Sequence, residues 1–188
     1  MRKGSPRDRS NRRSWQELIR HYDRVFRRRT RMELEWFRQQ PSLADAVRRA
    51  ALAENAKGRR YRHHCRINRD LLEEAARRLS KELPALRKAR SFHDLHRLVE
   101  RVVGGMHGIG ELYVYDTSFR IGSRLGLLPE KVYLHAGTRQ GARELGFDRT
   151  KWLEVGQLPA CLRTLPAYEI EDMLCIYQNR LPRERGCA

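Results

Sequence analysis

The chain has 188 residues, of which 40 are Lys or Arg and 23 are Asp or Glu, so its formal net charge at pH 7 is +17. This length accommodates one core of ordinary size and argues against several independent modules. Charged residues make up 34% of the chain, which excludes the uninterrupted apolar span of about 18 residues that a transmembrane helix needs. Such an excess of positive charge favours a polyanionic partner, first double-stranded or structured nucleic acid, with an anionic membrane surface as the alternative.

The four cysteines, Cys65, Cys161, Cys175 and Cys187, show no C-x-x-C spacing. This argues against a metal clip or a redox dithiol, and four cysteines are too few for a disulfide scaffold in a chain of this length. We therefore expect reduced thiols and a cytoplasmic protein, with association with the nucleoid as a further possibility.

Histidines also stand next to Cys65, in the string His63-His64-Cys65. Adjacent residues on a regular element point in different directions, so they are not expected to converge on one ion. The sequence thus predicts neither a metal site nor a cofactor.

Residues 1–13 contain six Arg or Lys and no large apolar residue after Met1. A segment of this composition cannot offset its ordering entropy, which predicts a disordered basic arm. An organelle transit peptide has a similar composition and is the alternative. Residues 14–188 are then expected to form a single helical domain.

Apolar residues recur at three- and four-residue steps through most of that domain, as they do in amphipathic helices. Helix starts are indicated by Ser14 with Glu17, by Asn68 and by Ser91 with Asp94, and helix ends by Pro84 and Gly126. No two-residue hairpin signal and no sustained alternation is present. The predicted fold is all-α and compact, with helices near residues 15–26, 43–51, 71–79, 92–103, 111–125 and 170–177.

Two internal segments concentrate positive charge. One is the cluster of Arg27, Arg28, Arg29 and Arg31, which we expect to contact phosphate. The other is the aromatic-bearing stretch 58–69, whose composition suits phosphate contact and equally an exposed loop.

A glycine-rich string, Val-Val-Gly-Gly-Met-His-Gly-Ile-Gly, joins two of the expected helices at residues 102–110. Gly108 and Gly110 allow a tight turn, and the helix that follows presents unpaired N–H groups, which favour a phosphate. The region of about 91–126 resembles the helix-hairpin-helix motif, which binds the DNA backbone without sequence specificity. The resemblance implies phosphate contacts around His107, Gly108 and Gly110, with Ile109 packing the hairpin. The alternative is a tight interhelical turn with Ile109 as a core residue.

The string Tyr-Asp-Thr-Ser-Phe that begins at Tyr115 is similar to one in helix-hairpin-helix DNA glycosylases, where the Asp is catalytic. That resemblance implies that Asp116 stabilises positive charge on a sugar as its base departs. In those enzymes the Asp lies well downstream of the glycine hairpin, whereas Asp116 follows Gly110 by only six residues. A shortened or non-catalytic derivative therefore fits better than a standard glycosylase. Residues 109–146 also resemble segments of small uncharacterised bacterial proteins.

A second glycine-containing helix start follows at residues 135–143. Thr138 is expected to cap this helix, with Arg139 and Arg143 on one face. Together with Gly137, these residues suit a second phosphate. The alternative is that Gly137 only shapes the turn. For His135 we expect a structural role. Near the C-terminus, Glu169 to Asp172 are expected to be helix-start charges.

Three function hypotheses follow from these patterns. The first is a DNA-binding protein that contacts the phosphate backbone through the helix-hairpin-helix element. The second is a glycosylase-like enzyme of DNA repair that uses Asp116. The third is an RNA- or ribosome-associated basic protein in which the glycine turns serve packing alone.

Overall fold

The computed structural model describes residues 14–147 and 150–182, and nearly all of their regular structure is helical. The predicted all-α class is therefore confirmed. The basic arm expected at residues 1–13 lies outside the described residues. Within the described part of the chain, no helix combines the length and apolarity needed to cross a membrane.

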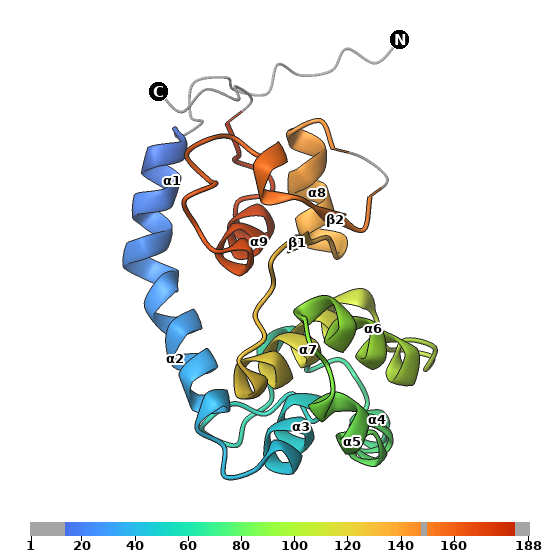
Figure 1. Cartoon of the computed structure of the whole chain (residues 1–188). Coiled ribbons are helices and arrows are strands. Elements are labelled where there is room, and N and C mark those ends of the chain that lie inside the picture. Colours follow the sequence, from blue (N-terminus) through green and yellow to red (C-terminus); the bar gives the residue numbers. More distant parts are fainter. Residues whose placement is uncertain (1–13, 148–149, 183–188) are drawn as a thin grey trace.

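The larger of two groups of elements, the large lobe, lies in the lower half of Figure 1. Its central helix is α7, which contacts α2, α3 and α6. Its core is formed by side chains such as Leu72, Leu79, Leu95, Val99 and Ile121, each at most 1% exposed. The lobe comprises α3 (Leu43–Ala51), η2 (Arg62–His64), α4 (Arg69–Lys81), α5 (Leu83–Arg87), α6 (Phe92–Val103) and α7 (Glu111–Leu125).

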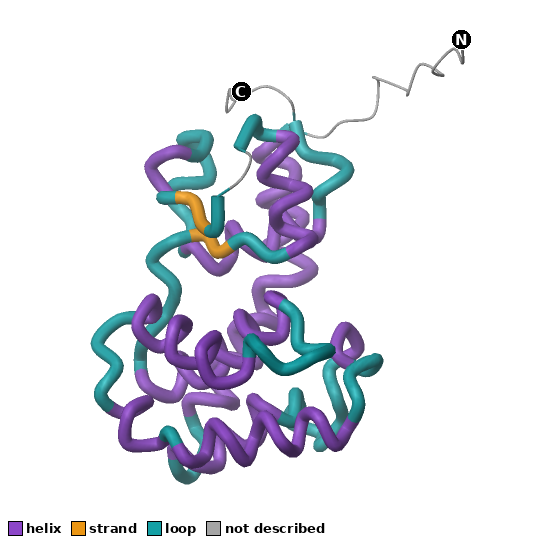
Figure 2. Tube along the Cα trace, turned by 90° about the vertical axis from the view of Figure 1, so that its right-hand side faces the viewer, coloured by secondary structure: helices purple, strands orange, loops and turns teal. Residues whose placement is uncertain are grey.

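The second group, the small lobe, lies above it and has a separate apolar core around Trp15, Leu18, Leu153 and Ile170. Two short antiparallel strands lie in this lobe (Figure 2), with Val132 opposite Leu153. The sequence patterns did not predict these strands, because each has only two residues. The lobe comprises α1 (Trp15–Tyr22), β1 (Val132–Tyr133), α8 (Ala136–Glu144), β2 (Trp152–Leu153), η3 (Val155–Gln157) and α9 (Ala167–Ile176).

A long N-terminal helix connects the two lobes. It runs from α1 through a π-helical turn (Asp23–Arg27) into α2 (Arg28–Arg38), so that α1 packs on α9 and α2 packs on α7. Figure 1 shows this helix beside both lobes, and the extended segment that leads from α7 to β1 running between them. A smaller aromatic cluster of Phe92, Tyr115 and Tyr133 also includes residues of both lobes.

Most of the helix boundaries marked by caps in the sequence are confirmed. Ser14 and Glu17 form the expected capping box, and the Asn68 side chain accepts from the N–H of Asp70. Ser91 caps α6 in the same way, and Gly126 ends α7 in the left-handed conformation, with φ of 74°. These local signals are reliable because each is satisfied by the backbone of its own turn.

Three local expectations are wrong. Pro84 does not end a helix but lies in the first turn of α5, where its missing N–H costs nothing. Thr138 does not cap α8, which begins at Ala136 after His135, because the Thr138 hydroxyl bonds sideways to Glu171. Cys65 and Cys175 are free thiols, whereas Cys161 is disulfide-bonded, so the expectation of reduced cysteines fails for Cys161.

Candidate functional site

Asp116 lies on α7, and two imidazoles from the η2 turn hydrogen-bond to its carboxylate. More than fifty residues separate these histidines from Asp116 in the sequence. The Nε2 atom of His63 lies 2.7 Å from Asp116 Oδ2, and the Nε2 atom of His64 lies 2.9 Å from the same oxygen. The expectation that adjacent histidines diverge is wrong here, because the tight turn at Arg62–His64 does not have the side-chain spacing of a strand or an α-helix.

Arg120, one turn further along α7, completes this group, which we call the Asp116 cluster. Its guanidinium lies 3.2 Å from Asp116 Oδ2 and 2.9 Å from Glu33 Oε1. It also lies over the Tyr61 ring, 3.8 Å from the centroid. The Arg120 side chain is only 3% exposed. Two carboxylates and an aromatic face therefore compensate one buried cation.

The protonation of the Asp116 cluster follows from these contacts. Burial alone would raise the pKa of Asp116, but the Arg120 charge and the hydrogen bonds from both histidines outweigh it and hold the pKa well below its usual range. Burial lowers the pKa of His64, partly opposed by Asp116. At neutral pH the cluster thus holds an ionised carboxylate that accepts a hydrogen bond from a neutral His64.

The glycine turn occupies residues 104–110, between α6 and α7. Gly108 has φ of 93°, which favours glycine, whereas Gly110 has φ of −106°, which any residue adopts. In residues 14–147 and 150–182, no side chain caps the beginning of α7 at Gly110. The first N–H of α7 bonded within the helix is that of Val114, which donates to the Gly110 carbonyl. The N–H groups of the preceding residues point out of the helix end, where they suit an anion.

The glycine turn packs against the beginning of α4, directly after the basic stretch 58–69. A Cβ at Gly108 would lie 3.1 Å from Leu71 Cδ2. Ile109 is partly buried against the large-lobe core together with Ile67 and Leu71. The structure therefore brings together two segments, 58–69 and 104–110, that lie far apart in the sequence. Exposed on these segments are Arg59, Arg62, Arg66, Arg69 and His107.

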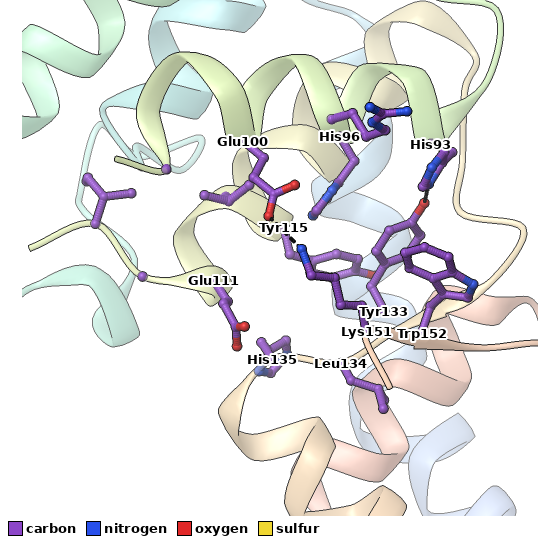
Figure 3. Close-up of a pocket in the computed structure, with 15 residues that line it drawn as sticks. His93, His96, Glu100, Glu111, Tyr115, Tyr133, Leu134, His135, Lys151 and Trp152 are labelled. Carbon is purple, nitrogen blue, oxygen red and sulfur yellow. Dashed lines mark hydrogen bonds and ion pairs between the residues drawn. The ribbon is translucent and has the colours of Figure 1, made fainter. Parts of the chain in front are cut away.

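A cavity of about 470 Å³ lies between the lobes, beside the glycine turn (Figure 3). Its wall combines aromatic rings with ionisable groups, and the hydroxyl of Tyr115 is buried there without a hydrogen-bond partner among the described residues. Glu100 and Lys151 form an ion pair across it at 3.5 Å, and His93 bonds to the Tyr133 hydroxyl. Asp116 does not line this cavity. Its lining includes Ile109, Gly110, Glu111, His96, Leu134, His135 and Trp152.

At the beginning of α8, where the second phosphate site is expected, the side chains of Thr138 and Arg139 already bond to other residues of the protein. The Arg139 guanidinium donates to both carboxylate oxygens of Glu111, at 3.0 and 3.1 Å, and to the Leu134 carbonyl. Thr138 lies in a buried group with His135 and Glu171. A Cβ at Gly137 would lie 2.8 Å from the Cys175 sulfur, so Gly137 permits close packing. Arg143 is exposed.

The arginine cluster on the long helix divides into two kinds of residue. Arg27 and Arg31 bind Glu169 of α9, which is 1% exposed, at 2.9 and 3.4 Å. These contacts join the long helix to the small lobe. Arg31 is nevertheless 62% exposed, so it suits a polyanion together with the exposed Arg28 and Arg29.

The acidic residues of α9 are more than helix-start charges. Besides Glu169, Glu171 contacts His135, and Asp172 accepts hydrogen bonds from Tyr22 and Thr30 at 2.7 and 3.0 Å. Burial and the nearby Glu171 charge raise the pKa of Asp172 to about 7. All three acids thus hold neighbouring elements in place.

Sequence patterns missed the partners of Asp116. The spacing of Asp116 and Arg120, one helical turn apart, was a usable signal for an ion pair. His63, His64 and Glu33 gave no such signal, because only the tertiary fold places them near α7.

A scan against protein-family models and searches of curated proteins and solved structures found no match to this chain.

Proposed function

We propose that this protein binds the phosphate backbone of double-stranded DNA at the face formed by the glycine turn 104–110 and the basic stretch 58–69. The observation that carries the proposal is the packing of this turn, which leads into an uncapped helix N-terminus, against the beginning of α4, which directly follows a segment of exposed arginines. N–H groups fix the position of a phosphate, and arginines supply attraction along a backbone.

The charge of the chain supports the same partner class. A net charge of +17 repels itself in the folded state, and release of counterions from a polyanion offsets that cost. Arg59, Arg62 and Arg66 are exposed within one short segment, which concentrates positive charge next to the glycine turn. The proposal needs no base contact and therefore implies binding without sequence preference.

The test uses two glutamate substitutions within the same turn. At both Gly110 and Gly105 an added Cβ meets open space. Gly110→Glu puts a negative charge at the N-terminus of α7, where we expect it to repel the phosphate and weaken duplex affinity about tenfold. Gly105→Glu makes the same charge change further from this helix end and serves as the matched control. Fluorescence anisotropy with a labelled duplex at fixed salt measures both.

Equal affinities for the two variants would remove the glycine turn from the interface. A DNA duplex, an RNA duplex and a single strand of equal length are compared in the same assay. Clear preference for RNA would favour the RNA- or ribosome-associated alternative over DNA.

Base removal by Asp116 has weaker support. The oxygen Oδ2 of Asp116 is already occupied by His63, His64 and Arg120, and the side chain is 15% exposed. A carboxylate held in this way favours an architectural role. Release of a damaged base by the parent protein, abolished by Asp116→Asn with duplex binding retained, would reverse this preference.

A further inference from the structure

The Asp116 cluster has the donor set of a metal site. The ligand-type atoms of His63, His64 and Asp116 all lie within 4.8 Å of one another. We propose that these three side chains bind one divalent transition-metal ion of the zinc class. This inference does not depend on nucleic-acid binding.

The geometry needs only a small adjustment. Each histidine presents Nε2 to Asp116 Oδ2, at 2.7 and 2.9 Å. Ligand atoms around a tetrahedral ion with bonds of about 2.1 Å lie about 3.4 Å apart. Moving the His63 imidazole about 0.7 Å and the His64 imidazole about 0.5 Å away from the carboxylate oxygen therefore makes room for the ion. Each imidazole then carries its proton on Nδ1 and coordinates through Nε2.

Aromatic packing already orients both imidazoles. The His64 side chain is 2% exposed and meets the Tyr113 ring edge-on, with centroids 5.5 Å apart. The His63 ring stacks on Tyr61 and meets His64 edge-on, at centroid distances of 5.9 and 4.3 Å. Preoriented ligands lower the ordering cost of binding.

Charge in the cluster also favours a cation, despite the high positive charge of the whole chain. Arg120 is neutralised by Glu33, to which it lies closer than to Asp116. The ionised Asp116 then leaves an excess of one negative charge beside two imidazoles. Arg120 is not a ligand, but its contact with Asp116 orients the carboxylate that coordinates the ion.

The donor types select the metal class, and the exposure indicates the kind of site. Two imidazoles and one carboxylate suit zinc and its neighbours better than magnesium or calcium, which prefer oxygen ligands. The His63 side chain is 47% exposed, so water can reach the fourth position. Three protein ligands with an open position are typical of a catalytic rather than a structural metal site.

The experiment titrates the chelator-treated full chain with Zn²⁺ by calorimetry and with Co²⁺ by visible absorption. We expect one ion per chain, and His63→Ala should weaken the affinity at least tenfold. Because His63 is half-exposed, this variant is expected to fold, which circular dichroism checks. Asp116→Asn should have an equal or larger effect.

Two matched controls test the donor set. His107→Ala removes an exposed imidazole elsewhere, and Cys65→Ser removes the exposed thiol next to the histidine pair. Both should bind as the parent does. Absence of saturable binding at one ion per chain, unchanged affinity in His63→Ala, or loss of binding in Cys65→Ser would overturn the assignment. The duplex affinity of the metal-free protein is measured in parallel. It tests the proposed DNA binding without the metal, so the two proposals can fail independently.

Discussion

Arg120 shows how a single residue connects distant parts of the sequence. Its guanidinium contacts Glu33 from the long helix, Tyr61 from the segment after α3, and Asp116 on its own helix. A buried cation with such partners contributes little net stability, but removing one partner leaves an uncompensated charge. The position of the basic stretch relative to α7 thus depends on Arg120.

The partly buried His96 makes the stability of the protein depend on pH. Burial lowers the pKa of His96, in the wall of the inter-lobe cavity, to about 4. Between pH 6.5 and pH 4 the unfolded chain binds a proton at this histidine and the folded chain does not. Stability from this group is therefore present above pH 6.5 and falls by about 1.4 kcal/mol per pH unit as the pH decreases through that interval.

The substitution His96→Phe tests this effect, because it keeps a ring beside Tyr133, whose centroid is 4.7 Å away. Urea denaturation at several pH values between 4 and 7 should show a smaller loss of stability on acidification for the variant than for the parent. Two curves that run parallel over this interval would contradict the assigned role of His96.

Among the elements, α8 and α9 approach closely at a glycine. A Cβ at Gly141 would lie 2.4 Å from the Leu174 carbonyl oxygen, a backbone atom that cannot rotate away. We expect Gly141→Ala to lower the free energy of unfolding by about 1 to 3 kcal/mol, even though alanine favours helices. Chemical denaturation measures the change. Gly105→Ala, where a Cβ meets open space, is the control, and equal stabilities of the two variants would contradict the close approach.

The elements also show where sequence patterns succeed. Ser14, Asn68 and Ser91 were identified as caps because the bond partner of each lies within three residues. Thr138 does not act as the predicted cap, because its hydroxyl bonds to Glu171, which belongs to another helix. Hydrogen bonds within one turn can be predicted from the neighbouring residues, whereas hydrogen bonds between side chains of different helices cannot.

The candidate site divides in the same way. The glycine turn was predicted from its spacing, and the structure places it at the beginning of α7 as expected. The histidine partners of Asp116 were not predicted, because nothing near Asp116 in the sequence points to His63 or His64. The inter-lobe cavity was not predicted either, since its wall combines α6, α7 and the two strands.

At the scale of the whole molecule, positive charge has two uses. Some arginines are internal to the architecture, as Arg27 and Arg120 are with Glu169 and Glu33. Others, such as Arg62, remain exposed and supply attraction to a polyanion. The net charge alone does not show whether a polyanion contacts one defined face or is attracted by the overall charge. The salt dependence of binding, compared between variants, separates these two cases.

Replacing Arg59, Arg62 and Arg66 with alanine removes three charges from the proposed face. If each contacts a phosphate, the slope of log affinity against log salt concentration should decrease by about 2 to 3, because fewer counterions are released. Anisotropy titrations across a salt series measure this slope for the parent and the variant.

The matched control is the triple alanine variant of Arg87, Lys88 and Arg90, which are exposed at the end of α5 and directly after it. It makes the same change in net charge, so the long-range field weakens equally in both variants. A smaller change in slope for this control locates the contacts at residues 58–69. If both triple variants lower the slope by the same amount, the duplex senses only the overall charge, and the proposed face has no specific part in binding.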